Sequence, residues 1–304
     1  MAAPNEISLR DYRVSFATAD DHWAFRHAFR SLEALFGAWS WARLSQRVHA
    51  ETAPGDCVWS TYLRLVGAKA EAIGDGISAI PRAGPVVFVA NHPTGIPDAA
   101  ILGDLIHRHI RTDALFISFR PFAEMPTVAD RSIAIDLPSP SGRVRPGAER
   151  NLARCFAKAR RHLRDGGSIV AFPAGPIAER TESGDVIDGP WRKAVFKLAT
   201  DTDAAVAPVF VGARMSPLRR TCQKLSPILF HASAVHEVRH IRRRRAAAVF
   251  GRPIVLEHLA QQRPGIDIAQ AMRETTYALE AMIDTTVAPL APRGLANRRR
   301  AQGA

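Results

Sequence analysis

The chain is predicted to be an α/β protein, with a mostly parallel central sheet flanked by helices and a helical segment at its N-terminus. After about residue 80, short runs rich in Val, Ile and Phe alternate with stretches of helical periodicity, which is typical of a parallel sheet covered by helices. Before residue 80 the pattern is helical and unusually aromatic. We therefore divide the chain into an N-terminal helical segment (1–75), an α/β domain (76–288) and a basic tail (289–304) that we expect to be disordered.

The predicted strands are apolar on both faces, as expected where helices cover both sides of a sheet. They are Val86–Ala90, Ala114–Ser118, Ser132–Asp136, Ser168–Phe172, Val206–Val211 and Ala247–Leu256. Helical periodicity places helices between them at Asp98–Ile110, Pro146–Asp165 and Pro190–Thr200, and a last helix at about Ile266–Ile283.

The first predicted helix, Asp21–Val48, combines aromatic and basic side chains. Its apolar positions include Trp23, Trp39 and Trp41, and several arginines are interleaved with them. A basic amphipathic helix with tryptophans suits contact with a membrane interface. The same pattern suits a helix packed on the body of the protein, so the sequence leaves both interpretations open.

Composition indicates an anionic partner. The 304 residues include 41 Lys and Arg against 29 Asp and Glu, a net charge of +12. No nucleic-acid-binding motif accompanies the basic run at 239–245, so we expect an anionic membrane surface and no nucleic acid. Three widely spaced cysteines indicate a reduced, cytoplasmic protein. No apolar run approaches the ~20 residues of a membrane span, so we expect peripheral attachment to the inner face of the cell membrane.

The first candidate for chemistry follows the strand at Val86–Ala90. Asn91 and His92 come directly after the strand, and Asp98 begins the next helix beyond a turn with Thr94 and Gly95. Sites in open α/β sheets form beyond the carboxyl ends of strands. A histidine held in one tautomer by a carboxylate can take a proton from a hydroxyl group. His92 and Asp98 are therefore a candidate catalytic pair, although a simple helix cap at Asp98 explains the spacing equally well.

A second turn lies about eighty residues further on. The strand Ser168–Phe172 runs into Pro173, Ala174 and Gly175. A glycine there permits close backbone approach, and such a turn can present N–H groups to an anion or a developing oxyanion. Taken alone, the segment is more simply an ordinary turn at the end of a strand.

In their order and spacing, these motifs resemble the lysophospholipid acyltransferase superfamily over roughly residues 75–256. That family has Asn-His and a nearby Asp, then a Phe-Pro-Glu-Gly turn, then a Val-Pro-Val strand, which here is Val206–Val211 with Pro208. Two features depart from the pattern, because five residues rather than four separate His92 from Asp98, and Ala174 replaces the Glu. Both departures are similar to the hemolysin-like and ornithine-lipid acyltransferase branch. The missing Glu argues against lysophosphatidate as the acceptor.

The resemblance implies a bacterial O-acyltransferase of phospholipid or related lipid biosynthesis that uses no metal and no cofactor. His92 would deprotonate the hydroxyl of a lyso-lipid acceptor, which attacks the thioester of acyl-CoA or acyl-carrier protein, and Asp98 would orient His92. Substrate contacts are expected from Asn91, Thr94, Gly95, Arg150, Pro173, Ala174 and Gly175. The acceptor head group, the acyl chain length, the thioester carrier and the oligomeric state are left open.

Two other functions compete with this interpretation. The segment from His236 through Glu237 to His240 matches the His-Glu-x-x-His pattern of zinc proteases. No third ligand is evident, although Glu257 and His258 are candidates. The other alternative is a non-catalytic protein that binds anionic lipids and keeps the acyltransferase fold.

Overall fold

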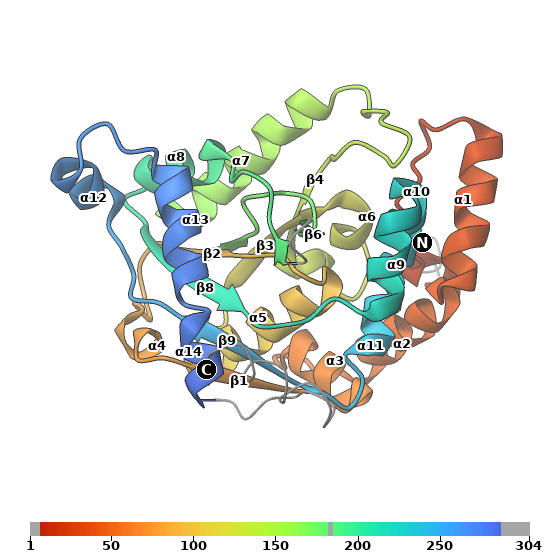
Figure 1. Cartoon of the computed structure of the whole chain (residues 1–304), viewed down its shortest axis with the longest axis horizontal. Coiled ribbons are helices and arrows are strands. Elements are labelled where there is room, and N and C mark those ends of the chain that lie inside the picture. Colours follow the sequence, from red (N-terminus) through yellow and green to blue (C-terminus); the bar gives the residue numbers. More distant parts are fainter. Residues whose placement is uncertain (1–6, 182–184, 287–304) are drawn as a thin grey trace, which may run out of the picture.

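The computed structural model describes residues 7–181 and 185–286, and its main sheet confirms the mostly parallel α/β class (Figure 1). Seven strands lie in the order β1-β9-β8-β2-β5-β3-β4, and every neighbouring pair is parallel except β8 and β9. They are β1 (Lys69–Ile73), β2 (Val86–Ala90), β3 (Ala114–Phe119), β4 (Ser132–Ile135), β5 (Ser168–Ala171), β8 (Ala205–Val211) and β9 (Arg245–Phe250). A small antiparallel hairpin is formed by β6 (Glu179–Arg180) and β7 (Val186–Ile187).

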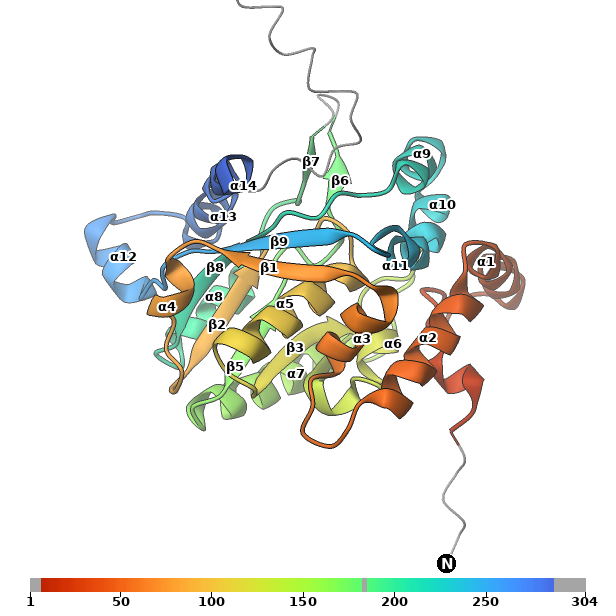
Figure 2. The same ribbon diagram turned by 90° about the horizontal axis from the view of Figure 1, so that it is seen from below.

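Helices surround the sheet, and further helices lie at the two ends of the molecule. Figures 1 and 2 show α1, α9 and α10 at one end of the molecule and α12, α13 and α14 at the other. The helices are α1 (Trp23–Leu35), α2 (Ala38–Glu51), α3 (Val58–Val66), α4 (Gly76–Ala79), α5 (Ile96–His109), α6 (Arg120–Ala123), α7 (Ala148–Arg164), α8 (Lys193–Thr200), α9 (Pro217–Leu225), α10 (Pro227–Ala232), α11 (Glu237–His240), α12 (Leu256–Gln262), α13 (Ile268–Ala278) and α14 (Ala281–Thr286). Short 3-10 helices occur at Leu9–Tyr12, Ala129–Arg131 and Ser233–His236.

Strand β2 lies at the centre of the sheet and is buried throughout. Successive side chains of a strand point to opposite faces. Phe88 accordingly packs in the core that contains α3 and α5, and Val87 and Val89 pack in the core that contains α7 and α8. Because both faces are covered, each position needs an apolar side chain. The end of β2 is thereby fixed in the middle of the molecule, two residues before His92.

The N-terminal part of the chain differs from the predicted continuous helix. Gly37 adopts a φ of 107°, which favours glycine, and it separates α1 from α2. Residues 69–73 form the edge strand β1, within the segment expected to be helical. Its sequence Lys-Ala-Glu-Ala-Ile is not apolar on both faces, so a search for covered strands does not find it.

The aromatic side chains of this region mostly pack inward. Phe29 and Trp41 are buried, whereas Trp23 and Leu35 are 64% and 81% exposed. Packing on the body of the protein therefore accounts for most of the aromatic pattern. No helix among the described residues is long and apolar enough to cross a membrane. The tail expected at 289–304 lies outside the residues that the structure describes.

Glu33 is a fully buried carboxyl group on α1. Its Oε1 accepts the backbone N–H of Phe16 at 2.8 Å, while Oε2 is buried and has no hydrogen-bond partner in the described part of the chain. Burial raises the pKa of Glu33 to about 7, although Arg13 and Arg30 act in the opposite direction. A raised pKa means that the folded state binds the Glu33 proton more tightly than the unfolded state does. The stabilisation from that proton is complete below the unfolded pKa of about 4.3 and is lost as the pH rises through about 7.

Glu33→Gln should therefore stabilise the protein more at pH 8 than at pH 5. Glutamine keeps an oxygen for the Phe16 N–H and carries no charge. The difference in free energy of unfolding between variant and wild type should grow by about 2 kcal/mol between the two pH values. Denaturant unfolding at each pH measures it, and a difference that does not change with pH would contradict the assignment.

Candidate active site

The side chains of His92 and Asp98 meet at the carboxyl end of β2. Asp98 is completely buried, and its Oδ2 accepts the Nδ1–H of His92 at 2.9 Å. The same oxygen accepts the backbone N–H groups of Thr94 and Gly95, each at 2.8 Å, and the Thr94 hydroxyl donates to Oδ1. Four donors thus satisfy both oxygens of this buried carboxylate. The contact to Nδ1 leaves Nε2 as the nitrogen that can accept a proton.

The five-residue spacing between His92 and Asp98 is explained by the turn between them. Gly95 has φ 90° and ψ −118°, a backbone conformation that is essentially restricted to glycine. A Cβ atom on Gly95 would lie 2.8 Å from Cδ1 of Ile177. This turn lets Asp98 cap the helix α5 and bind His92 at once. The two interpretations of Asp98 are therefore compatible.

Asn91 is buried and joins the ends of two neighbouring strands. Its Nδ2 donates to the carbonyl of Val211 at 3.1 Å, and its Oδ1 accepts the N–H of Val211 at 2.6 Å. The side chain thus continues the pairing of β2 with β8 past the end of the strand. Both of its polar groups face Val211, so the structure places Asn91 in support of His92.

The second predicted turn lies against the imidazole. The rings of His92 and Phe172 stack with centroids 3.9 Å apart and planes 19° apart. The backbone N–H of Ala178 donates to the carbonyl of His92 at 2.8 Å. The turn of Pro173, Ala174 and Gly175 follows Phe172 directly. Ala174, which replaces the family's Glu, is buried.

The backbone N–H groups expected to stabilise an oxyanion already have partners. The N–H of Gly95 donates to Asp98, and the N–H of Gly175 donates to the carbonyl of Phe172 at 2.9 Å. The N–H of Thr94 is likewise bound to Asp98. These glycines therefore shape the two turns around His92, and their own N–H groups are engaged within them.

A further carboxylate, Asp188, holds the backbone of His92. Its Oδ1 accepts the N–H of His92 at 3.1 Å, and its Oδ2 accepts the indole N–H of Trp191 at 3.0 Å. Burial raises the pKa of Asp188. Its own N–H donates to the hydroxyl of Tyr277 on α13, and Arg273 of the same helix donates to its carbonyl. Nothing in the sequence near Asp188 or Trp191 shows that this pair reaches the backbone of His92.

Two arginines are candidates for contact with the substrate. Arg150 is exposed on α7. Its neighbour Asn151 donates to the carbonyl of Ala134 on β4. Strand β4 lies three strand spacings, or roughly 14 Å, from β2. Arg192, which the sequence did not single out, is nearer. Its backbone N–H donates to the carbonyl of Pro173 at 3.0 Å, and a Cβ on Gly175 would lie 3.6 Å from its guanidinium. The exposed Arg192 guanidinium has no ion pair or hydrogen bond within the described residues.

The His-Glu-x-x-His segment forms a different environment. Glu237 is buried, and both of its oxygens accept the N–H of Ser216. His236 ends a 3-10 helix and His240 ends the single turn of α11. Among the described residues there is no group of three or more His, Cys, Asp or Glu side chains that could hold a metal ion. The carboxylate that a zinc protease would use as a base is therefore engaged with the backbone.

Comparisons with known proteins agree with the motif order. Residues 75–212 match the family model described as Acyltransferase. A lyso-glycine lipid O-acyltransferase of Bacteroides thetaiotaomicron is 24% identical over 227 residues, which are 71% of this chain and 77% of that protein. One of the same description from Phocaeicola vulgatus is 23% identical over 224 residues, 71% of this chain and 75% of that protein.

A solved structure, that of the 1-acyl-sn-glycerophosphate acyltransferase PlsC from Thermotoga maritima, aligns with 90% of this chain and 87% of that chain. Its sequence identity is 14% and its TM-score 0.46. The range matched by the family model contains His92, Asp98, the turn at Pro173 and Pro208 on β8. Asp188 and Arg192 also lie inside it, whereas Arg273 and Tyr277 lie beyond it.

Replacing Asn91 tests its structural role. Asn91→Ala leaves both polar groups of Val211 buried without their partner, so it should lower the free energy of unfolding by about 2 kcal/mol. Ser78→Ala, which removes an exposed hydroxyl bonded to the Asp75 carbonyl, should cost less than about 0.5 kcal/mol. Denaturant unfolding compares them, and equal losses would contradict the assignment.

Proposed function

The chain belongs to the lysophospholipid acyltransferase superfamily, and on this basis we propose that it moves a fatty acyl group from an acyl thioester to the hydroxyl of a lyso-lipid. The family resemblance seen in the sequence is confirmed, and with it the class of O-acyltransferase. The observation that carries the proposal is the contact of His92 Nδ1 with the buried Asp98 carboxylate, which leaves Nε2 as the base.

The proposed reaction is a direct transfer. His92 Nε2 takes the proton from the acceptor hydroxyl as the oxygen attacks the thioester carbonyl. A new ester C–O bond forms, the C–S bond breaks, and the proton on Nε2 passes to the departing thiolate. The charge of Asp98 stabilises the imidazolium between these two steps, and its contact with Nδ1 keeps the ring in orientation. The donor would be acyl-CoA or acyl-carrier protein.

The acceptor is proposed to be a lyso-lipid with an anionic head group. Arg192 supports this, because its exposed guanidinium lies against the turn that follows Phe172, and the Phe172 ring stacks on His92. A guanidinium binds carboxylate or phosphate through paired hydrogen bonds. A lyso-amino-acid lipid fits this position, and the two relatives described as lyso-glycine lipid O-acyltransferases favour it over lysophosphatidate. The enzyme would act at the inner face of the cell membrane.

Two alternatives remain distinguishable in the same assay. A non-catalytic lipid-binding protein would form no product from acyl thioester and lyso-lipid. A zinc protease acting through His236 and His240 would bind metal in stoichiometric amount and lose activity on chelation.

His92→Ala should reduce acyl transfer to a lyso-glycine lipid to below about 1% of the wild-type rate, because the base is removed. Mass spectrometry of the diacyl product measures transfer, with acyl-CoA and acyl-carrier protein tested as separate donors. The melting temperature should stay within a few degrees of wild type. His258→Ala on α12 is the matched control and should keep full activity. Full transfer by His92→Ala would overturn the mechanism.

Arg192→Gln should raise the KM for an anionic lyso-lipid roughly tenfold and leave kcat within about twofold, since it removes a contact made with the ground state as well as the transition state. Lys193→Gln is the matched control, because Lys193 pairs with Asp267 and not with the turn. If both variants change KM equally, the head-group assignment is wrong.

A further inference from the structure

Helices α9 and α10 present an exposed surface that is both apolar and basic. It consists of Leu218, Arg220, Lys224 and Leu225 on α9 and Ile228 on α10, and we call it the α9–α10 surface. Leu218 is 40%, Leu225 69% and Ile228 38% exposed. On a helix, residues seven apart share a stripe, as do residues four apart. The two leucines therefore form one stripe of α9, and the two basic residues form a second stripe roughly 130° further round the helix.

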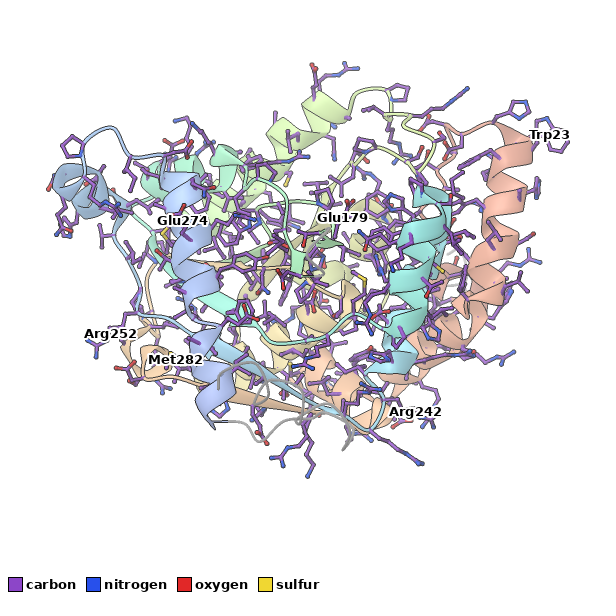
Figure 3. All side chains as sticks on the ribbon, viewed as in Figure 1. Trp23, Glu179, Arg242, Arg252, Glu274 and Met282 are labelled. Atoms are coloured by element: carbon purple, nitrogen blue, oxygen red, sulfur yellow. The ribbon has the colours of Figure 1, made fainter. Side chains whose placement is uncertain are left out.

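Acidic side chains are absent from this part of the sequence. Residues 204–236 contain no Asp or Glu. Helix α1 packs against α10, and its single carboxyl group, Glu33, is completely buried. The basic residues Arg239 and Arg242 continue the positive charge beyond α10 and are exposed. Figure 3 shows Trp23 and Arg242 at opposite ends of the edge that α1, α9 and α10 form.

The inner face of α9 is linked to the catalytic pair. Arg219 is only 1% exposed and stacks on the ring of Phe230, with Cζ 4.3 Å from the centroid. Burial lowers the pKa of Arg219 to about 10, and the charges of Glu237 and Asp98 oppose this effect. The segment 212–216 joins α9 to Val211, which Asn91 binds. A partner that seats on the outer face of α9 is therefore connected to the site through the segment 212–216.

From these observations we propose that the α9–α10 surface docks on an anionic lipid bilayer. Large apolar side chains beside arginine and lysine, in a segment that itself lacks Asp and Glu, match the interface of an acidic membrane; the nearest exposed carboxylate on a contacting strand is Glu179 of β6. A protein partner of ordinary composition carries charges of both signs, so docking on it would not require a surface on which positive charge predominates. The proposal rests on the proposed function in one respect, because the acceptor lipid then lies in the surface on which the enzyme docks.

The test is flotation of the full chain with two kinds of vesicle. One kind is phosphatidylcholine alone, and the other is an equal mixture of phosphatidylcholine and phosphatidylglycerol. Wild type should bind the anionic vesicles roughly tenfold or more tightly, and this preference should shrink as salt rises. Arg220→Glu/Lys224→Glu and Leu218→Ser/Leu225→Ser/Ile228→Ser should each weaken binding to the anionic vesicles roughly tenfold or more.

Matched controls come from α7, another amphipathic and basic helix. Leu152 is 43% exposed, and Arg154 and Arg161 are exposed. Leu152→Ser and Arg154→Glu/Arg161→Glu should bind the vesicles like wild type. Loss of binding in the α7 variants and not in the α9 variants would overturn the proposal, as would equal binding to both kinds of vesicle. If the triple serine variant fails to fold, the charge-reversal variant, altered only at exposed positions, decides alone.

His92→Ala separates this proposal from the proposed function. The inactive variant should float with anionic vesicles like wild type. If wild type binds the vesicles and transfers no acyl group, the proposed function fails and the docking surface stands. If wild type acylates a short-chain acceptor in solution and ignores the vesicles, the docking surface fails. A gel shift of double-stranded DNA that the α9 variants abolish, without vesicle binding, would assign the surface to nucleic acid and contradict the proposal.

Discussion

The carboxylate of Asp98 lies in the first turn of helix α5, inside the protein, where an ion without partners would be too costly to keep. Donors converge on it from Thr94, Gly95 and His92. The two backbone N–H bonds fix the conformation of the turn, and the bond from Nδ1 to Asp98 fixes the orientation of the imidazole. The same interactions that make the buried charge tolerable therefore hold the base in position.

The sheet delivers the remaining parts of the site to the same edge. Strands β2, β5 and β8 are parallel neighbours, so their carboxyl ends lie together. One end carries His92, the next carries Phe172 with its turn, and the third carries Val211, to which Asn91 is bonded. Asp188 directly follows β7, and its backbone N–H donates to the hydroxyl of Tyr277 on α13. Residues far apart in the sequence thus meet because the strands run in one direction.

Strands buried on both faces, and the pairing of His92 with Asp98, could be predicted from the sequence. Both follow from local rules: a covered strand needs continuous apolar residues, and a helix start favours an acidic cap. The edge strand β1 could not be predicted in this way, since its pattern is fixed by its pairing with β9. Pro208 is likewise explained only in three dimensions. Its ring lies against Gly251, where a Cβ would come within 2.9 Å of Cγ.

Contacts between residues far apart in the sequence also limit how much of the site could be predicted. Nothing near Asp188 or Arg192 in the sequence shows that one binds the backbone of His92 and the other lies against Gly175. The aromatic N-terminal segment gave two equal interpretations because amphipathic helices pack on proteins and on membranes with the same side chains. Burial of Phe29 and Trp41 favours packing on the protein for most of this segment, and an exposed apolar and basic surface lies on α9 and α10.

The rate of acyl transfer by Asp98→Asn tests most directly whether the Asp98 carboxylate holds His92 in position. The amide has one acceptor oxygen in place of two, and its N–H groups would face the donors of Thr94, Gly95 or His92. If the Asp98 carboxylate holds the base, kcat should fall by about a hundredfold or more, while circular dichroism shows a folded protein. A kcat within about twofold of wild type would show that the Asp98 carboxylate does not hold the base.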